Sequence, residues 1–463
     1  MTKPIEKAVT LNDVSFTYGG NSDGLRHISL AIVKGECLVL TGRSGNGKTT
    51  LTRLINGTAP SFYDGELRIF GRTSEKIESW ENAKLTGTVF QDPKSQFFSS
   101  DITGEIAFAA ENYGCPTLNI RRNVNRIINE MNLSGLKETT VDRLSSGEKQ
   151  KVAIAAVKIL APSIFVFDEP SANLDPGATE MLGNLMRTLK EDGHTLIIAE
   201  HRTAYLEDIA DRYVYLEHGK ITADYTRRQF LLLSEQERQE LGLRSSDTVT
   251  IPNLLSHSEP QKAFLRLSGI ECGYKKKLLF ENLSSSFHRG TITAVTGYNG
   301  QGKTSLAKII CGLKKESSGR VYFGNKHVPA RKRNKYVWFS SNDTNTQLFT
   351  SSVEEELLLL IKKDQSKIDE ARNLLRKLQL HDFKDRHPVT LSGGQKLRLS
   401  IACGLLSDRP VMIFDEPTSG LDGEGMRLVA ETFKTAANNE KCIIIISHDA
   451  ELIRECCTHH IAL

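Results

Sequence analysis

The chain has 463 residues, of which 39% are hydrophobic and 25% charged, and its 60 Lys and Arg residues against 56 Asp and Glu residues give a formal net charge of +4. This composition is that of a soluble globular protein, and it disfavours the disordered, collagen-like and coiled-coil classes. The length predicts about three domains of roughly 150 residues each. A charge balance this close to neutral argues against a protein held to nucleic acid by bulk charge, so we expect no nucleic-acid partner.

The eight cysteines show no C-x-x-C pair and no zinc-ligand spacing, and we expect reduced thiols in a cytosolic protein. The first residues, MTKPIEKAVT, lack the apolar core of a signal peptide. No apolar run approaches the roughly 18 residues that a membrane span needs. We therefore expect a chain that neither crosses a membrane nor is exported by this route, so that any membrane role comes through a partner.

The same series of segments occurs twice. GRSGNGKT begins at Gly42 and GYNGQGKT begins at Gly297, and they are followed in the same order by LSSGEKQ and LSGGQKL, by two FDEP segments, and by AEHR and SHDA. The paired segments are about 250 residues apart throughout. Two homologous halves therefore replace the three domains that the length suggested. We predict domain 1 at residues 1–235, a polar linker at 236–262 and domain 2 at 263–463.

Each half predicts the same elements in chain order. Alternating strands come first (TLNDVSFTY; FLRLSGIECGY), followed by an apolar strand (ECLVLTG; TITAVTG), the glycine-rich loop and a helix. A charged helical middle precedes two further apolar strands (IFVFDEP and TLIIAEH; VMIFDEP and CIIIISHD). Apolar runs bounded by turn residues and separated by helices indicate a mainly parallel sheet, so the predicted fold class is α/β.

The glycine-rich loops have the pattern G-x-x-x-x-G-K-[ST] directly after an apolar strand. In a phosphate-binding loop of this pattern, backbone N–H groups at a helix N-terminus converge on a phosphate. We expect Lys48 and Lys303 to reach the β- and γ-phosphates of ATP, and Thr49 and Thr304 to place hydroxyls on Mg²⁺. The predicted ATP-binding residues of the two loops are Gly42, Ser44, Gly45, Gly47, Lys48, Thr49 and Thr50 in the first half, and Gly297, Asn299, Gly300, Gly302, Lys303, Thr304 and Ser305 in the second.

An Asp-Glu pair ends an apolar strand in each half, at the sheet edge where open α/β folds bind ligands. The aspartate can hold Mg²⁺, usually through water. The glutamate is placed to orient or deprotonate an attacking water, and a histidine after a further apolar strand would contact the γ-phosphate. These residues are Asp168, Glu169 and His201 in the first half, and Asp415, Glu416 and His448 in the second.

The LSSGEKQ and LSGGQKL segments have the spacing of a capping box, with Ser145 three residues before Glu148 and Ser392 three residues before Gln395. Such a cap opens a helix and leaves amides with partial positive charge pointing outward. That arrangement suits the γ-phosphate of a nucleotide presented by another domain, so helix capping and ligand binding are compatible here.

Taken together, the phosphate loop, an LSGGQ-like signature, FDEP, a following SANLD or TSGLD loop and a late histidine resemble the ATPase domains of ABC transporters. The resemblance covers nearly all of both halves. It implies two tandem P-loop NTPase domains, each with a mainly parallel sheet core, an antiparallel β edge and a helical subdomain. In that family the two domains close head to tail, so that each ATP lies between one phosphate loop and the other domain's signature.

The resemblance also implies which side chains meet each nucleotide. It places Ser392, Gly393 and Gly394 opposite the first phosphate loop, and Ser145, Ser146 and Gly147 opposite the second. It further implies that Tyr18 and Tyr274 stack on adenine.

The two halves depart from the family pattern in different ways. TVFQDPKSQFF places Gln91 at the coupling position, where the family's glutamine touches Mg²⁺ and the transporter-facing groove. In the second half that position falls on Asn342 in one register and on Ser340 or its neighbours in another, and neither register gives a glutamine. Ser146 also replaces the first glycine of the signature. We therefore hypothesise that the first site dominates hydrolysis.

QDPKSQFF, NTQLFTSSVEEEL and INGTAPSFYDGELRIFGR resemble the ATPases of energy-coupling-factor (ECF) importers. Those importers take up vitamins and transition-metal ions with a transmembrane coupling protein and a small substrate-binding membrane protein. The resemblance implies a fused ATPase pair on the cytoplasmic face of the membrane, bound peripherally to such partners.

Two other classes stay open. A sugar-importer tandem ATPase generally has a degenerate second site, whereas both glutamates are present here. A soluble ribosome-associated translation factor also has two such domains, but it typically has a long charged helical linker, for which residues 225–262 are too short and too broken. The basic run RKRNK at residues 331–335 could bind RNA, although a solvated loop is favoured.

Overall fold

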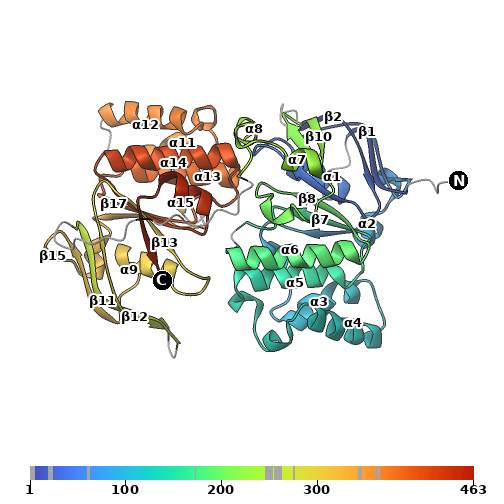
Figure 1. The fold of residues 1–463 in the computed structure, drawn as a ribbon, viewed down its shortest axis with the longest axis horizontal. Coiled ribbons are helices and arrows are strands. Elements are labelled where there is room, and N and C mark those ends of the chain that lie inside the picture. Colours follow the sequence, from blue (N-terminus) through green and yellow to red (C-terminus); the bar gives the residue numbers. More distant parts are fainter. Residues whose placement is uncertain are drawn as a thin grey trace. The chain divides into compact units, whose positions relative to one another are not determined.

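The computed structural model describes residues 6–18, 24–59, 63–172, 174–245, 254, 263–274, 277–342, 347–359, 361 and 365–463. The chain divides into two compact units, Met1–Asp247 and Thr248–Leu463. Each unit repeats one architecture (Figure 1), which confirms the prediction of two homologous α/β domains in place of three.

The described part of the first unit has two sheets. The smaller is antiparallel, with the order β2-β1-β4-β5, and the larger has the order β10-β9-β3-β8-β7-β6. Strands β9, β3, β8, β7 and β6 are parallel, and β10 pairs with β9 antiparallel. The strands are β1 (Lys7–Thr17), β2 (Gly24–Val33), β3 (Cys37–Thr41), β4 (Asp64–Ile69), β5 (Arg72–Thr73), β6 (Thr86–Val89), β7 (Ile164–Asp168), β8 (Thr195–Ala199), β9 (Arg212–Glu217) and β10 (Lys220–Thr226).

The central strands are buried on both faces, which explains their continuous apolar sequences. In β7, Phe165 and Phe167 face a core shared with the helices, while Ile164 and Val166 face the core beneath the antiparallel sheet. Successive side chains of a strand point to opposite faces, so one apolar run supplies both layers.

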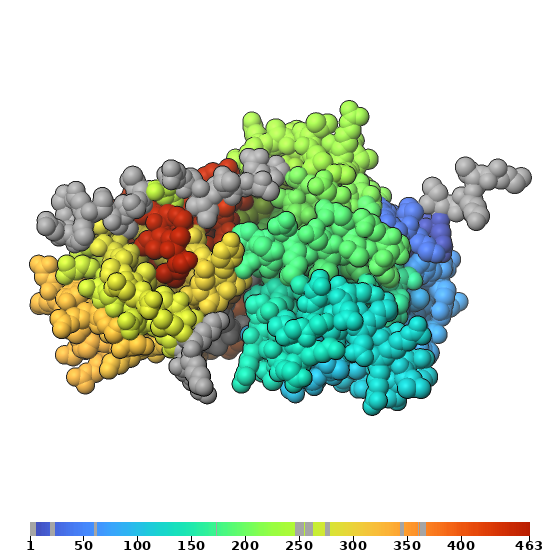
Figure 2. Space-filling view, turned by 60° about the horizontal axis from the view of Figure 1, so that its bottom comes forward, coloured from blue at the N-terminus to red at the C-terminus, as the bar shows by residue number. Residues whose placement is uncertain are grey.

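Helices cover both faces of the larger sheet. They are α1 (Lys48–Ile55), α2 (Ser79–Leu85), α3 (Ile102–Asn112), α4 (Thr117–Glu130), α5 (Ser146–Lys158), α6 (Pro176–Glu191), α7 (Arg227–Leu231) and α8 (Glu235–Glu240). Helix α1 contacts β7 and β8, whereas α3 and α4 pack on α5, which packs on α6 (Figure 1). Helices α3 to α5 form the predicted helical subdomain, and their cyan-to-teal surface is continuous on the face shown in Figure 2.

The first unit extends beyond the predicted boundary at residue 235. Helix α8 starts at the predicted boundary and runs into the predicted linker, where the side chains of Arg238 and Leu243 are buried. Phe230 of α7 stacks on Tyr213 of β9 at a centroid distance of 3.8 Å, and Arg238 lies over the same Phe230 ring. Residues on both sides of the predicted boundary therefore pack into the hydrophobic core of the first unit.

The described part of the second unit also has two sheets. The antiparallel sheet has the order β12-β11-β14-β15, and the parallel sheet has the order β16-β17-β18-β13-β19. The strands are β11 (Leu265–Tyr274), β12 (Lys277–Phe287), β13 (Ile292–Thr296), β14 (Ser318–Phe323), β15 (Lys326–His327), β16 (Val337–Ser340), β17 (Val411–Asp415), β18 (Cys442–Ile446) and β19 (His459–Ala462).

The helices of the second unit occupy the corresponding places, except that its helical part forms its own apolar cluster, including Leu357, Leu375 and Leu399. In the first unit the matching helices share one core with the sheet. The helices are α9 (Lys303–Cys311), α10 (Ala330–Arg333), α11 (Val353–Leu358), α12 (Gln365–Lys377), α13 (Gly393–Leu406), α14 (Gly423–Asn438) and α15 (Ala450–Cys456).

The basic run RKRNK is not a uniformly solvated loop, because Arg333 ends α10 and is fully buried. Its guanidinium donates to both carboxylate oxygens of Glu316 at 2.8 and 2.7 Å, and to the carbonyls of Val328 and Ile309 at 2.8 and 2.9 Å. The sequence prediction was wrong for this residue, since a largely buried bidentate partner, Glu316 in the segment between α9 and β14, offsets the cost of burying the charge.

All eight cysteines are free thiols, and seven of them are buried. Among the described residues, every helix is too short or too polar to span a bilayer.

Candidate functional site

Each phosphate loop joins a buried strand to the N-terminus of a helix. Gly42 (φ 134°) follows β3, and Gly47 (φ 97°) lies immediately before α1; Gly297 (φ 142°) and Gly302 (φ 101°) hold the same places before α9. A Cβ on Gly42 would lie 2.2 Å from the carbonyl oxygen of Leu216. These positions therefore require glycine for both conformation and space.

The loop lysines fold back onto their own loops. Lys48 Nζ donates to the carbonyl oxygens of Gly42 and Arg43 at 2.8 and 2.9 Å, and Lys303 Nζ donates to those of Gly297 and Tyr298 at 2.6 and 3.1 Å. Both lysines are largely buried at 4% and 7% exposure. Each ammonium is thus held at the concave face of a loop built to receive an anion.

Within the part of the chain that the structure describes, the first loop has an additional support without a counterpart at the second loop. Arg43 Nη2 donates to the carbonyl oxygen of Glu240 in α8 at 2.9 Å, and Gly242 packs under the Arg43 side chain. Tyr298 occupies the Arg43 position in the second loop and is 73% exposed. Residues beyond the predicted end of domain 1 therefore contact its phosphate loop.

A threonine and an aspartate meet at each predicted Mg²⁺ position. Thr49 Oγ1 donates to Asp168 Oδ1 at 2.9 Å, and Thr304 Oγ1 donates to Asp415 Oδ2 at 2.7 Å. Burial, and then the neighbouring Glu169, raise the pKa of Asp168 to about 6; burial likewise raises the pKa of Asp415. Hydroxyl and carboxylate oxygens are the ligands that Mg²⁺ takes, so the residues present fit that ion.

The two glutamates have an uncommon backbone conformation. Glu169 has φ 44° and Glu416 has φ 51°, both in the left-handed region. The backbone N–H of each donates across the sheet, to Ala199 and to Ile446 respectively, at 2.8 Å. Non-glycine residues held in this region concentrate at functional sites, because the surrounding structure must offset the strain.

In the first unit, the structure brings the predicted catalytic residues together. Gln91 Nε2 donates to Glu169 Oε2 at 2.8 Å, and His201 Nε2 lies 3.2 Å from Glu169 Oε1. Ser44 Oγ of the phosphate loop lies 3.5 Å from the same histidine nitrogen. Residues that follow β6, β7 and β8, and one from the loop after β3, therefore converge at the carboxyl edge of one parallel sheet.

The second unit arranges its residues differently. His448 Nε2 lies 2.9 Å from Lys303 Nζ and 3.3 Å from Asn299 Oδ1, but 4.0 Å from Glu416 Oε1. Ser447 Oγ donates to Glu416 Oε2 at 3.0 Å. No motif in the sequence marks Ser447 as a site residue. The one sequence difference that could have indicated it is the residue before the histidine, which is Ser447 in the second half and Glu200 in the first.

The signature segments begin α5 and α13 as full capping boxes. The Ser145 hydroxyl accepts from the Glu148 amide and Glu148 accepts from the Ser145 amide; Ser392 and Gln395 repeat the pair. Both caps thus present the first turn of a helix, as the spacing predicts. Ser146 and Gly147 lie in the first turn of α5, and Gly393 and Gly394 lie in that of α13.

The other predicted residues lie on or beside these loops. Thr50 and Ser305 follow the two threonines within α1 and α9, and Gly45 and Gly300 have φ 82° and 85° with open space where a Cβ would project. Tyr18 is 40% exposed and packs edge to face on Phe16. The side chain of Tyr274 lies outside the described residues.

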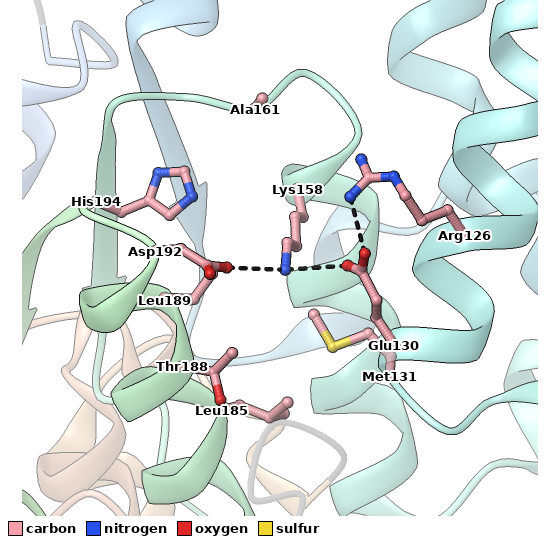
Figure 3. A pocket seen from close by; sticks show the side chains of 10 residues that line it. All are labelled: Arg126, Glu130, Met131, Lys158, Ala161, Leu185, Thr188, Leu189, Asp192 and His194. Carbon is pink, nitrogen blue, oxygen red and sulfur yellow. Dashed lines mark hydrogen bonds and ion pairs between the residues drawn. The ribbon is translucent and has the colours of Figure 1, made fainter.

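A cavity of about 600 Å³ lies apart from the predicted site residues, between α4, α5 and α6 (Figure 3). Lys158 of α5 pairs there with Glu130 of α4 at 3.2 Å and with Asp192, just after α6, at 3.5 Å. A matching cavity of about 400 Å³ lies between α12, α13 and α14, where Lys377 Nζ donates to Thr435 Oγ1 at 2.9 Å. Both cavities are bridged by lysines that tie the helical part to the helix packed against the parallel sheet.

The fold and the two phosphate-loop centres define a tandem P-loop ATPase. The chain matches the ABC transporter family over residues 25–172 and 280–419, and it belongs to that family. A Treponema denticola protein named "Putative ABC transporter ATP-binding protein" is 40% identical over 98% of this chain and 95% of its own length. The chain therefore has ABC-type ATPase activity and binds ATP.

Two further comparisons extend this similarity. The Bacillus subtilis protein named "Putative HMP/thiamine import ATP-binding protein YkoD" is 29% identical, over 97% of this chain and 88% of that protein. The structure titled "Model of ribosome-bound archaeal Pelota and ABCE1" has a TM-score of 0.70 and 21% identity, over 97% of this chain and 76% of that chain. This last similarity is one of fold.

Proposed function

We propose that this chain is the ATP-hydrolysing subunit of an ABC importer of the ECF type, bound peripherally at the cytoplasmic face of the membrane and energising uptake of a vitamin or a transition-metal ion. Its partners would be a transmembrane coupling protein and a small substrate-binding membrane protein. The near full-length similarity to a protein named for HMP/thiamine import supports this class of cargo. The head-to-tail pairing of the two units on ATP, which the family resemblance implies, is part of the proposal.

The observation that carries the membrane role is a matched pair of exposed aromatic residues. Phe98 and Phe349 are 74% and 80% exposed. Glu105 accepts the backbone N–H of Phe98 at 2.8 Å, and Glu356 accepts that of Phe349 at 2.9 Å. Both glutamates are buried at 3% and 6% exposure. A buried carboxylate that fixes an exposed phenylalanine in both halves supports a docking surface for an apolar partner helix.

The same loops contain the second glutamine of the ECF-like segments. Gln96 Oε1 accepts the backbone N–H of Phe90 at 3.0 Å, and Gln347 Oε1 accepts that of Ser341 at 3.2 Å. Each glutamine thus ties its aromatic loop to the end of the preceding strand. In the first unit that strand leads directly to Gln91, whose amide contacts Glu169. This chain of contacts would connect a docked partner with the hydrolytic centre.

Hydrolysis is assigned to the residues that converge at the sheet edge. Lys48 and the loop amides would bind the phosphates, and Glu169 would orient or deprotonate the attacking water while His201 contacts the γ-phosphate. Mg²⁺, held through Thr49 and Asp168, would neutralise phosphate charge. The second unit offers the corresponding residues Lys303, Thr304, Asp415, Glu416 and His448.

Capture of partners from solubilised membranes tests this proposal. We expect the tagged full chain to retain small hydrophobic membrane proteins, and the Phe98→Ser/Phe349→Ser variant to lose them. Leu118→Ser is the matched control, because Leu118 is also an exposed apolar residue, at 80% exposure, but belongs to α4 and not to the segments that contain Phe98 and Phe349. Capture of ribosomal RNA and ribosomal proteins instead would overturn the importer in favour of a translation factor.

A further inference from the structure

The two glutamates assigned to water activation are held by donors from different parts of the fold. In the first unit Gln91, which follows β6, is one donor to Glu169. In the second unit Ser447, which follows β18, donates to Glu416. The two contacts therefore approach the equivalent carboxylates from different strands of the same kind of sheet.

Ser447 is built to hold a fixed hydrogen-bond direction. Its side chain is fully buried, and its Oγ accepts the backbone N–H of Asp449 at 3.1 Å. Because that contact uses an oxygen lone pair, the hydroxyl hydrogen is left to point at Glu416 Oε2, 3.0 Å away. The hydroxyl thus fixes one carboxylate oxygen of Glu416 from a rigid, buried position.

The corresponding residue of the first unit, Glu200, accepts hydrogen bonds and donates none to Glu169. Glu200 stands before His201 as Ser447 stands before His448. Its carboxylate accepts from the backbone N–H groups of His201 and Arg202 at 2.7 and 3.1 Å, and from the hydroxyl of Tyr205 at 3.1 Å. An ionised carboxylate has no hydrogen to donate, so this position cannot support Glu169 in the way that Ser447 supports Glu416.

We propose that Ser447 is the positioning residue of the second hydrolytic centre. By donating to Oε2, it orients the Glu416 carboxylate so that Oε1, on the side of His448, can take a proton from the attacking water. That water forms the new bond to the γ-phosphorus, and the leaving ADP oxygen keeps the electron pair of the bond that breaks. The inference rests on the role of Glu416 in the proposed function.

The test separates the two centres with glutamine variants. In a Glu169→Gln background, single-turnover hydrolysis of ATP reports the second centre. We expect Ser447→Ala to lower its rate about fivefold to tenfold with an apparent ATP affinity changed less than about twofold, since a donated hydrogen bond near the reacting atoms is lost. Ser447→Thr, which retains the hydroxyl, should restore most of the rate.

Two controls distinguish positioning from damage to the fold. In a Glu416→Gln background, Ser447→Ala should leave the rate unchanged. Ser407→Ala removes another buried serine hydroxyl of the second unit, which donates to Gly404 at 2.7 Å, and it should leave the rate unchanged in both backgrounds. A loss of rate from Ser407→Ala as large as that from Ser447→Ala would contradict a specific role.

The remaining outcomes overturn different statements. If Glu416→Gln alone leaves turnover at the wild-type rate, the proposed role of Glu416 fails and the role of Ser447 fails with it. If Glu416→Gln matters but Ser447→Ala in the Glu169→Gln background does not, only the inference about Ser447 fails. A Glu169→Gln protein that hydrolyses no ATP also contradicts the inference, because the second centre must act through Glu416.

Discussion

Replacing Arg333 by methionine should strongly destabilise the second unit. Arg333 is fully buried and joins α10 to the C-terminal turn of α9 through the carbonyl oxygen of Ile309. Burial opposes ionisation of Glu316, but hydrogen bonds from Arg333 outweigh it and lower the Glu316 pKa. Arg333→Met removes the guanidinium donors to that largely buried carboxylate and to the carbonyls of Val328 and Ile309. Breaking one side of such a buried pair costs about 3–5 kcal/mol.

The two tryptophans supply the assay. Trp80 lies in the first unit and Trp338 in the second, and the chain has no other tryptophan. In a Trp80→Phe background, intrinsic fluorescence therefore reports unfolding of the second unit alone. For a unit of about 200 residues, a loss of about 3–5 kcal/mol lowers the melting temperature by roughly 6–20 °C.

Two companion variants separate charge burial from general damage. The Arg333→Met/Glu316→Met protein should recover most of the lost stability, because a buried ion pair can often be replaced by apolar groups of similar volume. Arg331→Met, at an exposed position of the same helix, should change the melting temperature by less than about 2 °C. A single variant as stable as wild type, or a double variant no better than the single, would refute the reasoning.

Two further outcomes follow from the structure. Lys158→Met should lower the free energy of unfolding of the first unit by about 1 kcal/mol, because two partly exposed ion pairs are lost. Arg121→Met, on the exposed face of α4, is the control and should lower it less. Trp80 fluorescence in a Trp338→Phe background measures both. Burial lowers the pKa values of His459 and His460 below their ordinary 6.5, so their neutral forms contribute stability that is lost as pH falls below 6.5. The melting temperature of His459→Asn/His460→Asn should therefore fall less steeply than that of wild type below pH 6.5, and an equal slope would contradict this.

The repeat and the parallel sheets could be predicted from sequence, because both faces of each central strand are buried and most of its residues are therefore apolar. The phosphate loops were also predictable. Their glycines at Gly42 and Gly297 are required by backbone conformation, and no side chain fits in their place. Features that depend on local backbone geometry, such as buried strands and glycine-rich loops, can thus be predicted from the local sequence.

Other features depend on partners distant in sequence. The sequence around Arg333 predicts a solvated charge, whereas in the structure Arg333 pairs with Glu316. Residues 236–247 read as a linker, yet Arg43 of the phosphate loop donates to Glu240 among them. Ser447 is an ordinary serine until its hydroxyl is seen to meet Glu416. Neither composition nor periodicity signals such long-range pairs.

Steady-state ATP hydrolysis by Glu169→Gln and Glu416→Gln proteins tests the central claim most directly, namely that both centres hydrolyse ATP and the first dominates. Gln91 and His201 both contact Glu169, whereas His448 lies 4.0 Å from Glu416. We expect both variants to lose activity, with the larger loss from Glu169→Gln and almost complete loss in the double variant. Equal losses, or a larger loss from Glu416→Gln, would contradict the account.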